Sequence, residues 1–337
     1  MRNSWPQSPW WLPGGHLQTI WAAKLAKRGD APVTWRRERW TTPDDDFVDV
    51  DWLANAPKAK VFPANAPLLV LLHGLEGSTQ SHYAEAFAQT AQQRGWRFAV
   101  PHFRGCSGEI NRQPRAYHSG DWQEIDWLLT RMQAQHAGDI YVVGISLGGN
   151  ALMRWAGEMG RRTQAAASGV RAIASICSPL DLVASGMALQ RGWNRWIYTP
   201  MFLQTMKPKA RAKWQQFPGL FDLERALRAR TLFEFDDAFT APVHGFDGVM
   251  DYWTRASAKP HMKHIALPAL ALNALNDPFI PKASLPSEDD VSKTVTLWQP
   301  ANGGHVGFAD GPFPAALHTM PKKVADWLTH TADQPHG

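Results

Sequence analysis

A serine between two glycines offers the clearest chemistry in this chain of 337 residues. Residues 144–148 are Gly-Ile-Ser-Leu-Gly, and they follow an apolar run at 140–143 that is typical of a buried strand. The segment after them, 149–156, favours a helix. A turn between strand and helix exposes its serine and needs small flanking residues, because the backbone passes close to itself there. The pattern predicts Ser146 as a nucleophile, and an ordinary N-cap serine is the alternative.

A serine hydroxyl needs a base, and the base needs an acid that orients it. When the nucleophile lies on such a turn, the chain order is serine, acid, histidine. Asp277 follows a predicted strand at 270–273, and His305 follows another at 294–298. Open α/β sheets form their sites at the carboxyl ends of strands, so we predict Asp277 as the acid and His305 as the base. Two other aspartates remain candidates for the acid, Asp181 and Asp251.

Acyl transfer also requires N–H donors for the oxyanion of the intermediate. Residues 73–77 are His-Gly-Leu-Glu-Gly and come directly after the apolar run 68–72. In this arrangement the backbone N–H of the residue after the nucleophile and an N–H of the earlier loop both donate to the oxyanion. We predict the backbone N–H groups of Leu75 and Leu147 as the oxyanion hole, and for His73 a structural role in hydrogen bonding within its loop.

A parallel sheet is the element that could bring these residues together. Continuous apolar runs at 68–72, 140–143 and 172–176 suit strands that are covered on both faces. Further strands are predicted at 97–100, 270–273 and 294–298, and residues 34–53 predict a β-hairpin or two edge strands. Helices are predicted at 81–94, 121–131 and 321–328. This alternation indicates a mostly parallel central sheet flanked by helices. With the serine turn, it predicts an α/β-hydrolase fold.

The alternation stops between residues 180 and 262, where the chain looks helical and contains no clear strand. We predict that 180–262 is a helical cap inserted into a core formed by 1–179 and 263–337. Its large apolar side chains predict either an apolar acyl pocket beneath the cap or a helical layer in which they pack only on one another. They are Trp193, Trp196, Met201, Phe202, Phe217, Phe221, Phe233 and Phe235.

The composition is that of a globular protein, 44% hydrophobic and 19% charged, with a net charge of +5. The basic residues are scattered, which favours solvated faces over a nucleic-acid site. No apolar run reaches the ~18 residues of a spanning helix, and no signal-peptide pattern begins the chain. Cys106 and Cys177 lie outside any metal-ligand spacing, which favours free thiols in a cytoplasmic protein. The oligomeric state is left open, as is peripheral lipid contact through Trp10 and Trp11.

The chain resembles the YheT-like branch of the α/β hydrolases over nearly its whole length. The shared motifs lie at residues 15–19, 73–77, 111–120, 144–150, 239–242, 245–246, 251–253, 276–278 and 303–305. The most specific motif is Arg-x-Tyr-His-Ser-Gly at 115–120. The resemblance implies the same nucleophile, acid and base, namely Ser146, Asp277 and His305. It also implies ester or lipid-ester substrates, since the group includes bacterial esterases and eukaryotic lipid hydrolases.

The expected reaction is therefore acyl transfer. Ser146 would attack a short- to medium-chain acyl ester or a lipid ester, His305 would take its proton, and water would release the acyl group. No cofactor or metal is expected. Two alternatives stay open: an acyltransferase that uses an alcohol in place of water, and a non-catalytic protein that binds a ligand in the same site.

Overall fold

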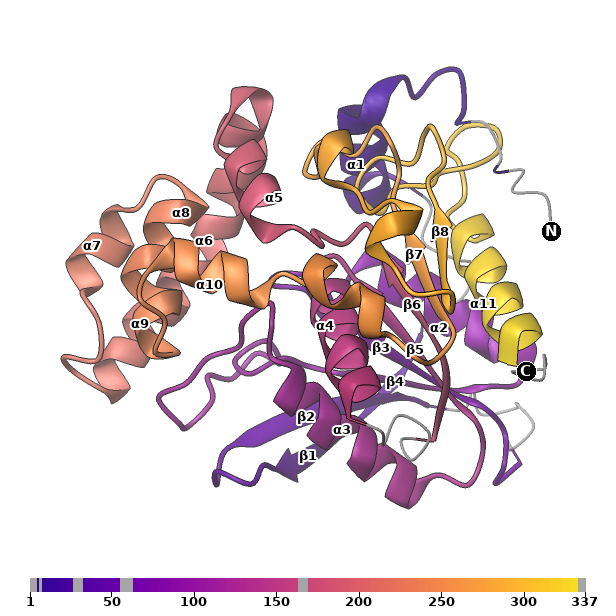
Figure 1. The fold of residues 1–337 in the computed structure, drawn as a ribbon, viewed down its shortest axis with the longest axis horizontal. Helices are drawn as coiled ribbons and strands as arrows, with labels where there is room; N and C mark the ends of the chain where they lie inside the picture. Colours follow the sequence, from indigo (N-terminus) through magenta and orange to yellow (C-terminus); the bar gives the residue numbers. More distant parts are fainter. Residues whose placement is uncertain (1–4, 6–7, 27–32, 55–62, 163–168, 333–337) are drawn as a thin grey trace.

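A central sheet of eight strands organises the chain, in the order β1-β2-β4-β3-β5-β6-β7-β8 (Figure 1). The computed structural model describes residues 5, 8–26, 33–54, 63–162 and 169–332. The strands are β1 (Trp35–Thr41), β2 (Phe47–Leu53), β3 (Leu68–Leu72), β4 (Arg97–Pro101), β5 (Ile140–Ile145), β6 (Val170–Ile176), β7 (Ala269–Leu272) and β8 (Val295–Trp298). β1–β2 and β2–β4 are antiparallel pairs, and the other five pairs are parallel. The predicted mostly parallel sheet is confirmed.

Helices cover both faces of this sheet, which explains its continuous apolar strands. α2 (His82–Arg94) and α11 (Thr319–Ala332) pack on one face, and α3 (Trp122–Gln135) and α4 (Leu147–Arg161) pack on the other. All five residues of β3 are buried. Full burial of one such Leu or Val side chain contributes about 1.5–3 kcal/mol. The buried sheet therefore fixes the positions of the loops at its carboxyl edge.

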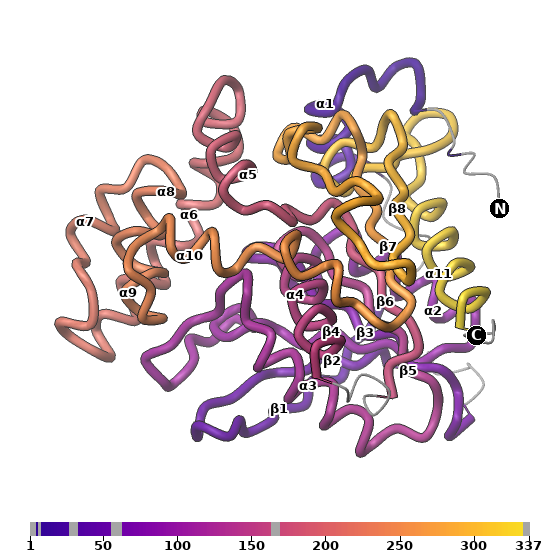
Figure 2. Tube along the Cα trace, viewed as in Figure 1, coloured from indigo at the N-terminus to yellow at the C-terminus, as the bar shows by residue number. Residues whose placement is uncertain are grey.

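Every residue between β6 and β7 is described, and none of them lies in a strand. The helices of this segment are α5 (Leu182–Leu189), α6 (Gly192–Gln216), α7 (Leu223–Arg228), α8 (Leu232–Phe235), a π-helical turn η2 (Asp236–Thr240), α9 (Ala241–Val243), α10 (Val249–Ala256) and a 3-10 helix η3 (Lys259–His264). Figures 1 and 2 show α5 to α10 grouped to one side of the sheet. They enclose an apolar cluster of their own, which includes Leu203, Phe235 and Phe239.

The remaining helices are α1 (Gly14–Lys24), η4 (Lys282–Ser284) and η5 (Glu288–Asp290). Two predicted helices are longer than expected. α3 continues to Gln135 because Met132 adds a fully buried side chain to its apolar face. α11 begins at Thr319, and Pro321 is tolerated in its first turn, where the missing N–H costs no helical hydrogen bond.

Two expectations from composition concern the chain as a whole. A membrane-spanning helix does not occur among the described residues, since none of their helices combines sufficient length with sufficient apolar character. The sulfurs of Cys106 and Cys177 are not joined to each other, as predicted. Cys177 is buried beneath the site, where burial raises the pKa of its thiol well above the usual value.

Candidate active site

One residue, Ser146, joins β5 to α4, with φ 52° and ψ −118°. A left-handed φ at a residue other than glycine costs about 1–3 kcal/mol, so the surrounding structure must hold it. The Ser146 N–H donates to the Ile176 carbonyl oxygen at 2.9 Å. A Cβ on Gly148 would lie 2.5 Å from the carbonyl oxygen of Leu72, so only glycine allows α4 to approach β3 this closely. The turn leaves the serine half-buried at the end of its strand.

His305 and Asp277 meet Ser146 at this edge of the sheet. His305 Nε2 lies 3.0 Å from Ser146 Oγ, and His305 Nδ1 lies 2.8 Å from Asp277 Oδ2. Because a carboxylate only accepts hydrogen bonds, Nδ1 carries the proton and the serine hydroxyl donates to Nε2. The Asp277 side chain is fully buried, and its other oxygen accepts the Phe279 N–H at 2.8 Å. The structure thus brings together the three residues that the sequence singled out, in an arrangement that can take the serine proton.

The two rival aspartates have other partners. Asp181 caps α5, where its Oδ1 accepts the Ala184 N–H at 2.9 Å. Asp251 lies on α10 and pairs with Arg255 at 2.9 Å. These contacts give both carboxylates a structural role, and Asp277 is the one that bonds to the imidazole.

The loop after β3 lies directly against the serine, since a Cβ on Gly74 would be 3.2 Å from Ser146 Cβ. The Gly74 and Glu76 N–H groups donate to the hydroxyls of Tyr83 and Tyr117, each at 3.1 Å. Between them, the Leu75 N–H has no acceptor among the described residues.

The N–H of Leu147 is likewise without an acceptor among the described residues, because Leu147 is the first residue of α4. Two such donors beside a nucleophile are what an oxyanion hole requires. Leu75 and Leu147 line the same pocket as Ser146, and the role of their N–H groups as an oxyanion hole stays a prediction.

His73 has the structural role that the sequence predicts. Its Nδ1 lies 2.8 Å from the Gly74 carbonyl oxygen, and the Phe103 N–H donates to its Nε2 at 3.0 Å. The ring is therefore neutral, with the proton on Nδ1. Complete burial lowers the pKa of His73 to about 3, which keeps the ring uncharged. His73 joins the loop after β3 to the loop after β4.

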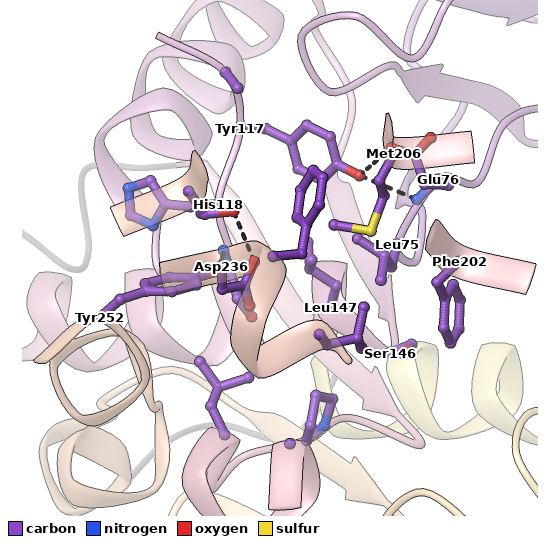
Figure 3. Close-up of a pocket in the computed structure, with 18 of the residues that line it drawn as sticks. Leu75, Glu76, Tyr117, His118, Ser146, Leu147, Phe202, Met206, Asp236 and Tyr252 are labelled. Carbon is purple, nitrogen blue, oxygen red and sulfur yellow. Dashed lines mark hydrogen bonds between the residues drawn. The ribbon is translucent and has the colours of Figure 1, made fainter. Parts of the chain in front are cut away.

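A mainly apolar pocket opens from Ser146 and His305, and Figure 3 shows the side chains that line it. Most of the lining belongs to the helical segment and to the loop after β4, with smaller parts from the loops after β3 and β7. Its apolar members include Leu75, Ile110, Ala116, Leu147, Pro179, Leu182, Leu189, Phe202, Met206, Leu232, Phe235, Phe239, Trp253, Phe279 and Ile280. The Phe279 ring centroid lies 4.2 Å from that of His305, so this ring forms a wall directly beside the imidazole.

Seven of the eight large apolar side chains predicted for this segment divide into three groups. The eighth, Phe217, is half-buried, and its ring centroid lies 5.6 Å from Lys213 Nζ. Phe202 and Phe235 line the pocket. Phe221 packs on Phe239, and Phe233 packs on Trp253, within the helical layer. Trp193, Trp196 and Met201 are exposed. Some of these side chains therefore line an apolar pocket and others pack within the helical layer, while the exposed ones do neither; the use of the pocket for an acyl group stays a prediction.

A polar group borders the pocket beside Leu75. The Glu76 carboxylate accepts from the Tyr117 hydroxyl at 2.7 Å and pairs with Lys209 Nζ of α6 at 2.8 Å (Figure 3 shows the bonds to Tyr117). Burial raises the pKa of Tyr117 well above its usual value, so it stays protonated. This group ties α6 to the loop that carries the Leu75 N–H.

The comparisons with known proteins agree with this architecture. Residues 67–312 match the family model of the alpha/beta hydrolase fold. The chain belongs to the α/β-hydrolase family. This hydrolase is 35% identical to the Escherichia coli K12 protein named "Putative esterase YheT", over 93% of its own length and 90% of that protein, and it belongs to the YheT-like branch.

The hydrolase is also 27% identical to Phospholipase ABHD3 of Mus musculus, over 90% of this chain and 74% of that protein. Among solved structures, the α/β hydrolase GrgF of Penicillium sp. sh18 aligns with a TM-score of 0.56 at 14% identity. That alignment covers 89% of this chain and all of the other, and at this identity it shows the fold alone.

Helix α1 of the hydrolase holds the loop that carries His305, a contact that sequence reasoning missed. Thr19 Oγ1 accepts the His305 N–H at 2.8 Å and donates to the Gly15 carbonyl oxygen at 2.7 Å. A Cβ on Gly15 would lie 1.8 Å from the Asn276 carbonyl oxygen, so glycine is required for α1 to pack beside the Asp277 loop.

Gln18 makes the second set of contacts between α1 and the catalytic loops. Its side-chain oxygen accepts the Gly303 N–H at 2.9 Å and the Asn276 side-chain N–H at 3.0 Å. Its side-chain nitrogen donates to the Leu12 carbonyl oxygen at 3.0 Å. The motif at 15–19, which had no role in the predicted chemistry, therefore positions the loops of both the acid and the base.

The motif at 115–120 anchors the helical segment to the core. Asn150 of α4 donates to the Ser119 carbonyl oxygen at 2.9 Å and to that of Ala256 at 2.9 Å. The Tyr252 hydroxyl of α10 accepts the Ser119 N–H at 3.0 Å. A Cβ on Gly120 would be 2.7 Å from Ala256 Cα, so α10 can pack closely only against glycine.

The described ranges contain no group of three or more His, Cys, Asp or Glu side chains arranged to hold a metal ion.

Proposed function

We propose that this hydrolase is a serine esterase that cleaves carboxylic esters through an acyl-enzyme on Ser146. The observation that carries the proposal is the hydrogen-bonded series from Ser146 Oγ to His305 and from His305 to Asp277, at 3.0 and 2.8 Å. These distances lie within the range expected of a nucleophile and its base before substrate binds. The esterase and phospholipase names of its relatives support the same class of reaction.

In the proposed reaction, Ser146 Oγ attacks the ester carbonyl while His305 Nε2 takes the hydroxyl proton. The carbonyl oxygen becomes an oxyanion that the Leu75 and Leu147 N–H groups stabilise, and Asp277 stabilises the imidazolium. His305 then protonates the leaving alkoxide, which departs as the alcohol. Water attacks the acyl-enzyme with His305 as base, releases the carboxylic acid and restores the serine.

We further propose that residues 180–262 act as a cap that provides the acyl-binding surface. Phe202 and Met206 of α6 and Phe235 of α8 line the pocket that opens from Ser146. Apolar walls favour a hydrocarbon acyl chain, because each buried methylene contributes about 0.8 kcal/mol to binding. The proposed substrates are short- to medium-chain acyl esters or lipid esters.

A fluorophosphonate probe followed by peptide mass spectrometry tests the proposed nucleophile. The expected result is one labelled peptide, which contains Ser146 and is absent in Ser146→Ala. A Ser185→Ala variant is the control, since Ser185 also lines the pocket but has no hydrogen bond to a base. Labelling that persists in Ser146→Ala, or that is lost only in Ser185→Ala, would place the nucleophile elsewhere.

A pair of phenylalanines tests the acyl pocket. Phe235 and Phe221 belong to the same buried cluster, but Phe235 lines the pocket and Phe221 does not. Phe235→Ala should lower kcat/KM for octanoate esters more than for acetate esters, whereas Phe221→Ala should leave that ratio unchanged. An unchanged ratio in Phe235→Ala would refute the proposed pocket.

A further inference from the structure

Four aromatic side chains of the described chain are at least 70% exposed: Trp10 at 91%, Trp193 at 71%, Trp196 at 74% and Phe313 at 70%. Trp193 and Trp196 lie on the outer side of α6, three residues apart and therefore on one face. Trp10 precedes α1, and Phe313 packs near α1 against Trp11. Exposed aromatic side chains that gather in one region indicate a contact surface.

The two regions are neighbours. One shallow hollow is lined by His16 of α1 together with Arg191 and Trp193 at the start of α6, and His16 Nδ1 lies 3.2 Å from the Tyr198 hydroxyl on α6. Figure 1 shows α1 and the turn between α5 and α6 at the same end of the molecule. We call this region the α1–α6 surface, and its residues are His16, Arg191 and Trp193 of this hollow, with Arg195, Trp196 and Lys207 farther along α6.

The α1–α6 surface carries only positive charge. Residues 8–26 and 182–221 contain no Asp or Glu. Arg191 lines the hollow beside Trp193, while Arg195, Lys207 and Arg230 line a second hollow beside Trp196, and neither hollow has a carboxylate. Exposed indoles with arginines beside them fit the head-group region of a bilayer, where tryptophan lies at the boundary and basic side chains meet lipid phosphates.

We propose that the α1–α6 surface binds the surface of an anionic lipid bilayer. Trp193 and Trp196 enter the head-group region, and Arg191 and Arg195 contact lipid phosphates. A second copy of the chain fits less well, because two positively charged surfaces repel each other. The inner side of α6 lines the pocket through Phe202 and Met206, so the bound bilayer lies on the helix that borders the site.

Co-sedimentation of the full chain with vesicles tests this proposal. One set contains phosphatidylcholine alone, and the other also contains phosphatidylglycerol at about 30 mol%, which makes it anionic. The protein should bind the anionic vesicles preferentially, and less at high salt. The double variant Trp193→Ala/Trp196→Ala should lower the partition coefficient at least about tenfold, and Arg191→Gln/Arg195→Gln should abolish the preference for anionic lipid.

Two matched variants serve as controls. Met250→Ala removes a 43%-exposed apolar side chain on α10, and Arg36→Gln removes an exposed charge on β1; both should bind like the wild type. Thermal unfolding verifies that each variant is folded. Co-sedimentation measures vesicle binding and not ester turnover, so its result is independent of the proposed esterase activity. Absence of vesicle binding, equal binding to both vesicles, or undiminished binding of the tryptophan variant would overturn the proposal. So would a dimer of the wild type that the tryptophan variant cannot form, since the occupant would then be a second copy.

Discussion

Thr19 provides a sharp test of how α1 positions the base. Its hydroxyl is the only acceptor that the described structure gives the His305 N–H, at 2.8 Å, and the residue itself is buried. Thr19→Val keeps the shape of the side chain but removes the acceptor. Leaving a buried N–H unpaired costs about 1–3 kcal/mol. If the loop relieves this cost by moving the imidazole away from Ser146, kcat should fall about 5- to 150-fold.

The matched variant is Thr19→Ser, which keeps the hydroxyl and should retain most of the activity. Thr19 does not line the pocket, so KM for a soluble ester should stay near the wild-type value in both variants. Steady-state kinetics with one nitrophenyl ester give both parameters, and thermal unfolding separates a local effect from global destabilisation. Wild-type kcat in Thr19→Val, or an equal loss in Thr19→Ser, would refute the positioning role.

Three further predictions concern the nucleophile, the pocket and a buried acid. Ser146→Ala should lower esterase turnover by roughly 10⁴–10⁶ and Asp277→Asn by about 10⁴; near-normal turnover of either, measured with the same ester, would contradict its role. From acetate to octanoate esters, kcat/KM should rise and then level off, with at most about 5 kcal/mol gained over six methylenes; a steady fall beyond acetate would exclude the apolar acyl pocket. Burial raises the pKa of Asp236 to about 6, so the folded state holds the carboxyl proton more tightly than the unfolded state does. This proton binding stabilises the folded state at low pH, and the stabilisation is lost as pH rises through 6. Asp236→Asn should therefore raise Tm relative to the wild type more at pH 8 than at pH 5, and a difference independent of pH would contradict this.

The strand ends were predictable because their signals are local. Glycines around Ser146, and loops that begin after apolar runs before Asp277 and His305, follow from the steric needs of the turn and the geometry of a parallel sheet. The structure places these side chains within hydrogen-bond distance. The prediction that the Leu75 and Leu147 N–H groups act together also rests on chain order and needs no long-range information.

The role of α1 could not be predicted in the same way. Thr19 and His305 are 286 residues apart, and the motif at 15–19 has no spacing that is typical of a catalytic group. The sequence also could not show which face of α6 lines the pocket, because aromatic residues occur on both sides of this helix. Phe202 faces the pocket while Trp193 and Trp196 face outward, and this depends on how the whole helix packs.

The central claim is that an acyl group is carried on Ser146, and trapping the acyl-enzyme tests it most directly. The protein is mixed with an octanoate ester, quenched in acid within the first turnover and digested for mass spectrometry. The peptide that contains Ser146 should gain the mass of one octanoyl group, and Asp277→Asn should show slower formation of the same adduct. Ester turnover without any adduct on this peptide, or an octanoyl group on another residue that forms at the rate of turnover, would contradict the claim.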